Sequence, residues 1–525
     1  MNVPLTPLRC LRHAEEQFPG NTAVVCDGRR FTYQQFAERA GRLGGGLLTM
    51  GINPGDRVAF LSSNCHRLLE AYYGVLEAGA VLLPLNIRLA PPELAYILND
   101  AEVKILFFES QFLPAVEAFR RAARSVESFV LLDAKPEASW TAPRNYEDLL
   151  AGAGIHQRDV MQVDENSLAE LFYTSGTSAN PKGVMLTHRN IYLHALNVAI
   201  ALQVTGETVE LHTIPLFHAN GWGKAHTTTL AGGTHVMIHQ FSPAEVFRLI
   251  EREHVQCCCL VPTMAAALLN SPERDKYDLS SLHRVIIGGA ASSPVLVREV
   301  EDKLGCGCIS GYGLTETSPV LTFSPLKANM QLSEVQRHTR QAMAGFAIPG
   351  AELRVVDQDG ADVPSDAKTV GHVVARGDGI MHGYWRQPEE TDHVFRGGWF
   401  HTGDLATIDE DRYILIVDRE KDIIVSGGEN ISSLELEKAL GTHPSVYEAA
   451  VIAVPHEKWG EVPKACVVLK PGSFATEAEL FEVCRSCLAR YKCPHYIEFH
   501  ESLPKTGTGK ILKRELRKEA RPASQ

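Results

Sequence analysis

The sequence contains no run of about 18 uninterrupted apolar residues, the length that a membrane-spanning helix requires. Its opening, residues 1–10, also lacks the long apolar stretch of a secretory signal peptide. The final Pro-Ala-Ser-Gln differs from a Ser-Lys-Leu peroxisomal address. We therefore expect a soluble, cytoplasmic protein with no integral membrane segment.

Blocks of like charge are missing as well. The chain has 51 lysines and arginines against 63 aspartates and glutamates, which gives a formal net charge of −12. Without a basic stripe, neither a nucleic acid nor an anionic membrane surface is an expected partner. A hydrophobic content of 45% with 22% charged residues is ordinary for a soluble globular enzyme.

The 12 cysteines do not indicate a disulfide or zinc framework. Cys257 to Cys259 are consecutive in an apolar run, which favours small buried core residues. Cys484 and Cys487 form a C-x-x-C on a segment with a helical pattern, but no second pair follows at zinc-site spacing. Packing is therefore the preferred interpretation for both groups.

A chain of 525 residues is too long for one core and should form two or three domains. Its apolar patterns alternate between strand and helix periods, with no internal repeat and no low-complexity linker, which predicts layered α/β structure. The expected strands are 57–62, 80–85, 103–108, 168–173, a segment from residue 285, 449–454 and 465–469. The expected helices are 31–48, 66–78, 93–99 and 477–489, with a domain boundary near 418–421.

The most informative stretch, residues 173–183, reads Tyr-Thr-Ser-Gly-Thr-Ser-Ala-Asn-Pro-Lys-Gly. Gly176 lets the backbone approach a polyphosphate, hydroxyls and amides donate to its oxygens, and Lys182 adds a charge. No Ser or Thr follows Lys182, so this is not a Walker P-loop. A preceding buried strand and a helix capped by Thr187 predict a nucleotide-type loop between strand and helix. A solvated turn is the alternative for such a composition taken alone.

Two further motifs carry candidate site residues. The run Ile-Pro-Leu-Phe-His-Ala-Asn-Gly-Trp-Gly contains His218 and Trp222, although a histidine beside aromatics is more often a core residue. In Ser-Gly-Tyr-Gly-Leu-Thr-Glu-Thr, Tyr312 suits stacking on a base, while Thr315 and Glu316 suit phosphate and Mg²⁺. A tight turn is the alternative for the second motif.

The C-terminal third adds three patterns. Asp404 follows a turn and suits paired ribose hydroxyls, with a simple Asx turn as the alternative. Ser432, with Glu435 three residues later, predicts a capping box for a helix through residue 440. Lys505 and Lys510 flank a Thr-Gly-Thr-Gly loop, which as an isolated string is typical of a flexible basic tail.

Six such motifs, in this order and over nearly the whole chain, resemble the adenylate-forming superfamily of acyl-CoA synthetases, peptide-synthetase adenylation domains and firefly-type luciferases. The resemblance implies an α/β fold with a large multi-subdomain N-terminal domain, residues 1–419. A small mobile α/β C-terminal domain, residues 420–525, would follow it. One departure is visible, because Ser178 and Ala179 replace the threonine and glycine usual in the first loop.

The resemblance also implies a role for each motif. The expected ATP phosphate contacts are Thr174, Ser175, Gly176, Thr177, Ser178 and Lys182, with Thr315 beside them and Glu316 on Mg²⁺. The expected adenine and ribose contacts are Gly289, Ala290, Tyr312, Asp404 and Arg419. The acid is expected near His218, Trp222 and Gly313, and CoA near Gly428. Lys421 would be the hinge and Lys510 the lysine of adenylation, so that the catalytic residues are Lys510, His218, Thr315 and Glu316.

The implied activity is an AMP-forming acid–thiol ligase that uses ATP, Mg²⁺ and CoA. A carboxylate is a poor electrophile, so it must first be joined to AMP before a thiol attacks it. Trp222 resembles an aromatic gate of fatty-acid-activating members, and the small residues around it could leave room for a chain, which favours a medium- or long-chain fatty acid over an aryl acid. The alternatives are an aryl-acid CoA ligase, an enzyme that loads a carrier protein, and a nucleotide or acyl-CoA binding protein without turnover. The sequence leaves open whether the chain forms a homodimer.

Overall fold

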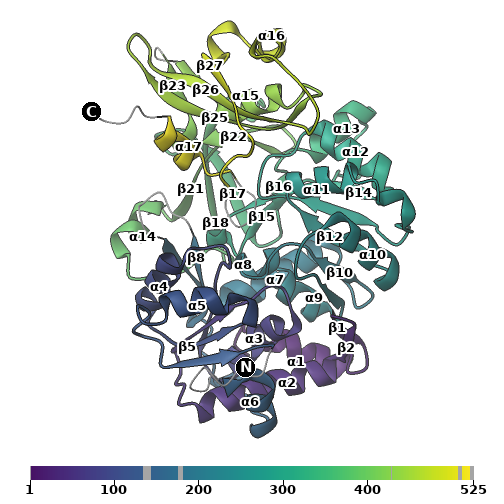
Figure 1. Cartoon of the computed structure of the whole chain (residues 1–525), viewed down its shortest axis with the longest axis vertical. Helices are drawn as coiled ribbons and strands as arrows, with labels where there is room; N and C mark the ends of the chain where they lie inside the picture. The colour runs from purple at the N-terminus through teal and green to yellow at the C-terminus, as the bar shows by residue number, and fades with distance from the viewer. Residues whose placement is uncertain (1, 134–143, 175–180, 427–428, 506–510, 521–525) are drawn as a thin grey trace.

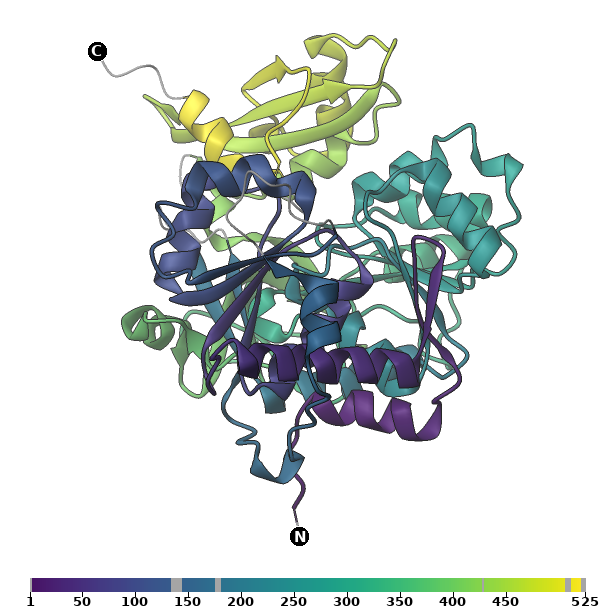
Figure 2. The same ribbon diagram turned by 60° about the horizontal axis from the view of Figure 1, so that its bottom comes forward.

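The computed structural model describes residues 2–133, 144–174, 181–426, 429–505 and 511–520. Four β-sheets organise this part of the chain. Two large sheets and a five-stranded sheet form the N-terminal portion. The last sheet begins after Arg419 and forms a layer of its own, coloured yellow-green at the top of Figure 1 and still apart from the purple N-terminal elements in Figure 2.

The first large sheet has eight strands and the second has nine. The order in the first is β19 (Gly383–Tyr384), β9 (Lys182–Thr187), β8 (Leu168–Thr174), β4 (Val81–Pro84), β3 (Arg57–Leu61), β5 (Val103–Phe108), β6 (Ser128–Leu131) and β7 (Arg144–Asn145). The order in the second is β16 (Phe346–Ala347), β15 (Val320–Phe323), β14 (Gly307–Gly313), β13 (Arg284–Ile287), β12 (Cys257–Leu260), β10 (Val209–His212), β11 (Thr234–Met237), β1 (Thr22–Cys26) and β2 (Arg29–Thr32).

The largest apolar core joins both sheets through the helices between them. Those helices are α1 (Leu8–Gln17), α2 (Tyr33–Thr49), α3 (His66–Glu77), α7 (His188–Leu202) and α9 (Lys224–Ala231). The outer face of the eight-stranded sheet packs on α4 (Pro91–Asp100) and α5 (Leu113–Phe119), and the other sheet packs on α10 (Pro243–Glu253), α11 (Pro262–Leu269) and α12 (Pro294–Leu304). Burial on both faces is why these mostly parallel strands read as continuous apolar runs.

The five-stranded N-terminal sheet leads into the C-terminal layer. It contains β17 (Ala351–Val356), β18 (Gly371–Gly377), β20 (Phe395–Arg396), β21 (Trp399–Ile408) and β22 (Ile414–Arg419). The last sheet contains β23 (Ile424–Ser426), β24 (Glu429–Ile431), β25 (Val446–His456), β26 (Gly460–Leu469) and β27 (Tyr496–Phe499). Its helices are α15 (Ser433–Leu440), α16 (Glu477–Cys487) and α17 (Lys513–Glu519). The remaining helices are α6 (Tyr146–Gly152), α8 (Ala219–Trp222), α13 (Glu334–Gln341) and α14 (Pro388–Val394).

Most predicted elements are present, with four local corrections. The first loop does not join a strand to a helix, because β9 intervenes and pairs antiparallel with β8 before Thr187 caps α7. Tyr312 and Asp404 lie within strands β14 and β21 rather than at turns. Only half of the capping box at Ser432 forms, since its hydroxyl accepts from the Glu435 amide while the Glu435 carboxylate pairs with Lys492. The helices predicted at 31–48 and 477–489 are Tyr33–Thr49 and Glu477–Cys487.

The packing predicted for the cysteines is found at Cys258, Cys259 and Cys484, which are buried, whereas Cys257 is partly buried and Cys487 is exposed. All 12 thiols are free. In the described part of the chain, no helix combines the length and apolar character that a bilayer crossing demands.

Candidate active site

The candidate site begins where neighbouring parallel strands end. Gly289 and Ala290 follow β13, and Gly313 is the last residue of β14, its parallel neighbour. Trp222 reaches the same edge, since a Cβ added to Gly288 would lie 3.0 Å from ring atom Cζ3 of Trp222. The carboxyl ends of strands in α/β sheets are where ligands bind, so the predicted adenine and acid residues converge as that rule requires.

Tyr312, Asp404 and Arg419 form one hydrogen-bonded group. The Tyr312 hydroxyl donates to Oδ2 of the buried Asp404 at 2.6 Å, and Nε of Arg419 lies 3.2 Å from Oδ1 of Asp404. Asp404 and Arg419 face each other across β21 and β22, which explains their pairing. Burial, followed by the charge of Asp404, raises the pKa of Tyr312 well above its ordinary value, so this phenol remains a donor.

A second group holds the predicted phosphate lysine. Lys182 opens β9, is buried, forms an ion pair with Glu390 of α14, and places Nζ 5.3 Å from the centre of the Tyr384 ring. The Tyr384 hydroxyl donates to Oε1 of Glu316 at 2.9 Å. Burial and the Glu316 charge raise the pKa of Tyr384. Thr174 faces Lys182 in the β8–β9 pair, so Lys182 and Glu316 meet at Tyr384 and Thr174 lies beside Lys182.

Sequence reasoning missed Tyr384 and Glu390. Tyr384 is placed by β19, which pairs antiparallel with β9 and sets Tyr384 opposite Val184. No motif spacing signals this contact, because the two strands are about 200 residues apart in sequence. The two groups nevertheless adjoin, since Tyr312 in β14 and Glu316 on the turn after that strand are only four residues apart.

Thr315 and Glu316 lie on the short 3₁₀ turn Thr315–Thr317, directly after β14. The Glu316 carbonyl accepts from the Met381 amide at 2.8 Å, which ties this turn to the segment before Tyr384. Gly313 has a structural reason to be glycine, because an added Cβ would collide with the carbonyl of Pro319. The geometry therefore accounts for Gly313 without the substrate contact predicted for it.

The segment that carries His218 and Trp222 is held in an unusual backbone conformation. His218 precedes the short helix α8, in which Ala219, Asn220 and Trp222 have φ angles of 39°, 48° and 59°. Left-handed conformation costs L-residues about 1–2 kcal/mol each, so surrounding contacts must fix it. The ring of Phe217 lies 4.6 Å from that of His218.

Glu170, which was not predicted, supplies one of those contacts and is itself held by α9. Its carboxylate, on β8 and fully buried, accepts from Nδ2 of Asn220 at 2.9 Å and lies 2.6 Å from Nε2 of His226 on α9. The strand that leads into the phosphate loop thus also anchors the segment around Trp222. A lone glutamate in an apolar strand is the signal that was available, because a buried carboxylate requires partners.

The predicted hinge, Lys421, lies on the 3₁₀ turn Glu420–Asp422 between β22 and β23. Three residues earlier the buried Asp418 carboxylate accepts from the Ser433 amide at 2.6 Å and from its hydroxyl at 2.7 Å. Arg517 of α17 donates to Asp422 at 2.7 Å. The start of the C-terminal layer is therefore fastened on both sides of Lys421.

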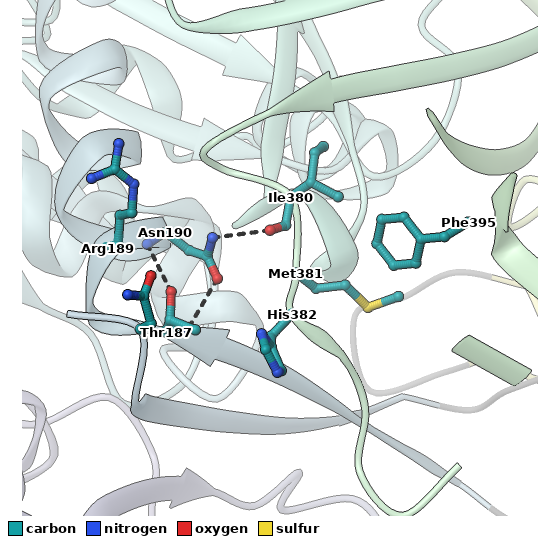
Figure 3. A pocket seen from close by; sticks show the side chains of 8 residues that line it. Thr187, Arg189, Asn190, Ile380, Met381, His382 and Phe395 are labelled. Atoms are coloured by element: carbon teal, nitrogen blue, oxygen red, sulfur yellow. Dashed lines mark hydrogen bonds between the residues drawn. The ribbon is translucent and has the colours of Figure 1, made fainter. Parts of the chain in front are cut away.

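A pocket of about 280 Å³ lies behind this site, between the start of α7 and residues 380–382 (Figure 3). The Asn190 side chain lies between Ile380 and Thr187 and bonds both (Figure 3). Its Nδ2 donates to the Ile380 carbonyl at 3.0 Å, and its Oδ1 accepts from the Thr187 amide at 2.9 Å. Among the predicted site residues that the structure describes, none lines this pocket. Its hydrogen bonds instead fix the segment that continues to Tyr384.

Six predicted site residues lie outside the described residues. They are Ser175, Gly176, Thr177 and Ser178 of the glycine loop, Gly428 and Lys510.

The sequence matches two known families. Residues 11–385 match the AMP-binding enzyme family, and residues 435–510 match the AMP-binding enzyme C-terminal domain. A long-chain-fatty-acid–CoA ligase of Thermus thermophilus is 41% identical over 496 residues, 93% of this chain and 90% of that protein. A peroxisomal butyrate–CoA ligase of Arabidopsis thaliana is 37% identical over 537 residues, 98% of this chain and 93% of that protein.

A solved structure agrees in fold. The crystal structure of an anthranilate CoA ligase in complex with anthranoyl-AMP superposes with a TM-score of 0.89 at 27% identity and covers 99% of this chain and 98% of that one. The chain belongs to the AMP-binding enzyme family. This confirms the predicted family, the α/β fold with a large N-terminal and a smaller C-terminal domain, and the predicted class of AMP-forming acid–thiol ligase.

Proposed function

We propose that this enzyme joins a hydrophobic carboxylic acid to AMP with release of pyrophosphate and then transfers the acyl group to CoA. A medium- or long-chain fatty acid is the favoured acid, and the products are acyl-CoA and AMP. The observation that carries the proposal is the meeting of Lys182, Tyr384 and Glu316 with the group around Asp404 at one site. This arrangement offers a cation, a metal-binding carboxylate and a ribose-binding carboxylate together.

Within this proposal ATP spans the group of Tyr312, Asp404 and Arg419 and the group of Lys182, Tyr384 and Glu316. The ribose hydroxyls bind Asp404 and Arg419, because a fixed carboxylate accepts from paired hydroxyls. The phosphates bind Lys182 and Thr315, along with Thr174, Ser175, Gly176, Thr177 and Ser178 of the loop. The adenine lies along Gly289, Ala290 and Tyr312. Since the Tyr312 hydroxyl is held by Asp404, the position of its ring depends on the ribose site.

The residues present fit a Mg²⁺ ion. Glu316 offers a hard carboxylate, one oxygen of which already accepts from Tyr384, and Mg²⁺ in phosphate sites is commonly held by one or two carboxylates and the phosphates themselves. Glu316 would hold the ion. The ion would neutralise charge that develops on the phosphate during attack.

The acid is assigned to the segment around His218 and Trp222. Trp222 packs against an apolar cluster of eight buried residues, among them Ile214, Val261 and Ile286, and apolar surroundings favour an alkyl chain. The anthranilate ligase with the same fold supports an aryl acid as the second candidate. A comparison of acids distinguishes the two.

The second half-reaction requires motion. Lys510 must reach the phosphates during adenylation, whereas thiol attack needs the same face open to CoA near Gly428. We assign the boundary to residues 419 and 420 and the pivot to Lys421. A rotation there would separate Asp418 from Ser433, which lie on opposite sides of the pivot, so those hydrogen bonds belong to one orientation only.

Exchange of labelled pyrophosphate into ATP tests the first half-reaction. Lys182→Met should lower the exchange rate on the order of 10²–10³-fold, the usual effect of removing one pre-aimed donor. Lys104→Met is the matched control, since Lys104 also pairs with an acid, Asp56, but is 33% exposed and belongs to none of the predicted site motifs. Equal rates in both variants would remove Lys182 from the phosphate site.

A further inference from the structure

A cysteine, an aspartate and a histidine meet at a place that none of the active-site motifs includes. Cys26 is the last residue of β1, Asp27 begins the turn to β2, and His239 follows β11. Strands β1 and β11 are parallel neighbours, so the residues after them emerge at the same edge of the sheet. The register of the sheet therefore brings His239 next to the consecutive residues Cys26 and Asp27.

The three candidate ligand atoms lie close to the spacing of a tetrahedral metal site. Nε2 of His239 lies 2.9 Å from Oδ2 of Asp27 and 3.9 Å from Sγ of Cys26, and Sγ lies 3.7 Å from Oδ2. Zinc bonds of about 2.3 Å to sulfur and about 2.0 Å to nitrogen and oxygen, at tetrahedral angles, separate such atoms by about 3.3–3.6 Å. We propose that Cys26, Asp27 and His239 bind a zinc-type transition metal ion.

The chemistry of the donor set selects this class of ion. A thiolate with an imidazole suits zinc and related soft or borderline ions, whereas Mg²⁺ and Ca²⁺ prefer all-oxygen sites. Binding replaces the S–H bond of Cys26 with an S–metal bond and releases that proton to solvent, while the neutral His239 ring carries its own proton on Nδ1 so that Nε2 is free to bind. The hydrogen bond between Nε2 of His239 and Oδ2 of Asp27 joins two of the ligand atoms, so it holds both near the position of the ion that would replace it.

The surroundings leave room for a fourth ligand. A cavity of about 270 Å³ opens beside Asp27 and His239 and is lined further by Glu245, Arg248 and Arg252. Both arginines already pair with carboxylates, Arg248 with Glu245 and Arg252 with Glu253. Their charge is therefore compensated, and a water molecule can complete the coordination from the cavity side.

A neighbouring histidine gives an independent sign of a missing polar partner. His66 is only 2% exposed, and neither of its ring nitrogens has a hydrogen-bond partner among the described residues. Its backbone amide contacts the Cys26 thiol, and its ring stacks on Phe31 at 4.9 Å. Buried polar groups without partners are rare in folded proteins, and a hydrated ion at Cys26 would bring polar atoms to this position.

The test uses the full-length enzyme freed of metal by a chelator and then titrated with Co²⁺. The wild type should develop a thiolate-to-cobalt charge-transfer band that saturates at one Co²⁺ per chain and disappears when Zn²⁺ is added. Cys26→Ser should abolish the band, and His239→Ala should weaken Co²⁺ binding by at least about 10-fold. Cys487→Ser is the control, because Cys487 is an exposed thiol on α16 and its loss should leave the band intact.

Thermal unfolding supplies a second readout, since an ion that binds only the folded chain raises its melting temperature. Zn²⁺ should raise that temperature in the wild type and in Cys487→Ser but not in His239→Ala, whose ring is 39% exposed. No saturable band in the wild type, or a band that persists in Cys26→Ser, would overturn the proposal. Neither result depends on the activity assigned to the enzyme.

Discussion

The buried carboxylate of Glu170 offers a direct test of how the segment around His218 and Trp222 is positioned. Three non-glycine residues of that segment have positive φ angles, which store about 3–6 kcal/mol at about 1–2 kcal/mol each. Glu170 makes one hydrogen bond to this segment, with Asn220, and one to His226 on α9. A bond to a charged group contributes about 1.5–3 kcal/mol, so the bond to Asn220 offsets part of the stored strain.

Glu170→Ala should therefore release the segment as well as destabilise the fold. We expect kcat/KM for the acid to fall about 10–100-fold, the size of effect that small misplacements of a bound reactant produce. The KM for ATP should remain unchanged, because Asp404 and Arg419 do not contact Glu170. Steady-state kinetics with acid and ATP varied separately would measure both constants.

Glu170→Gln should largely retain the wild-type kinetics. Its oxygen can accept from His226, and its new amide can donate to Oδ1 of Asn220, which has no hydrogen-bond partner among the described residues. Glu70→Ala is the control for general destabilisation, because Glu70 is equally buried but bonds Arg39 and Tyr146. The reasoning is refuted if Glu70→Ala raises the acid KM as much as Glu170→Ala, or if the Gln and Ala variants behave alike.

Three further predictions address the cycle, the acid and stability. Lys510→Ala should abolish acyl-adenylate formation but spare transfer from supplied acyl-AMP to CoA. Lys421→Pro, which fixes φ near −65°, should instead spare pyrophosphate exchange and stop thioester formation. Equal losses of both half-reactions in either variant would contradict these roles. Trp222→Ala should change the ranking of chain lengths from butyrate to palmitate, since each buried CH₂ contributes about 0.8 kcal/mol, and an unchanged ranking would argue against a gate. Burial lowers the pKa of His188 and His194 to about 3 and the pKa of His212 to about 4. In the unfolded chain these histidines take up a proton near pH 6.5, whereas in the folded chain they do not. Acidification from pH 7 to 5 should therefore lower the free energy of unfolding on the order of 2 kcal/mol per histidine. Urea unfolding with the same midpoint at both pH values would exclude this.

The sequence was sufficient for elements whose pattern is local. Strand β3 and helix α3 have the expected bounds within one residue, because an apolar run and a helical period each read out over a short window. Strand β9 was missed. Its six residues lie between the glycine loop and Thr187, the cap of α7, so the sequence predicted the helix directly after the loop.

The candidate site was predictable where motifs carry it and not where tertiary contacts do. Tyr312, Asp404 and Arg419 each belong to a recognisable string, and the structure joins them. Tyr384 reaches the site only because β19 pairs with β9, a contact between distant segments that no spacing encodes. Asp418 was likewise predicted only as part of the domain boundary, whereas its carboxylate is buried at the N-terminus of α15.

The activity proposed for the enzyme is the synthesis of acyl-CoA from a hydrophobic alkyl acid. The most direct measurement is AMP release that depends on both ATP and CoA, compared across acids from acetate through palmitate together with benzoate and cinnamate. We expect the highest kcat/KM for a medium- or long-chain fatty acid, because kcat/KM should rise along the series as methylene groups enter the apolar site. Faster turnover of benzoate or cinnamate than of any fatty acid would contradict the assigned substrate, and no AMP release with any acid would contradict the activity itself.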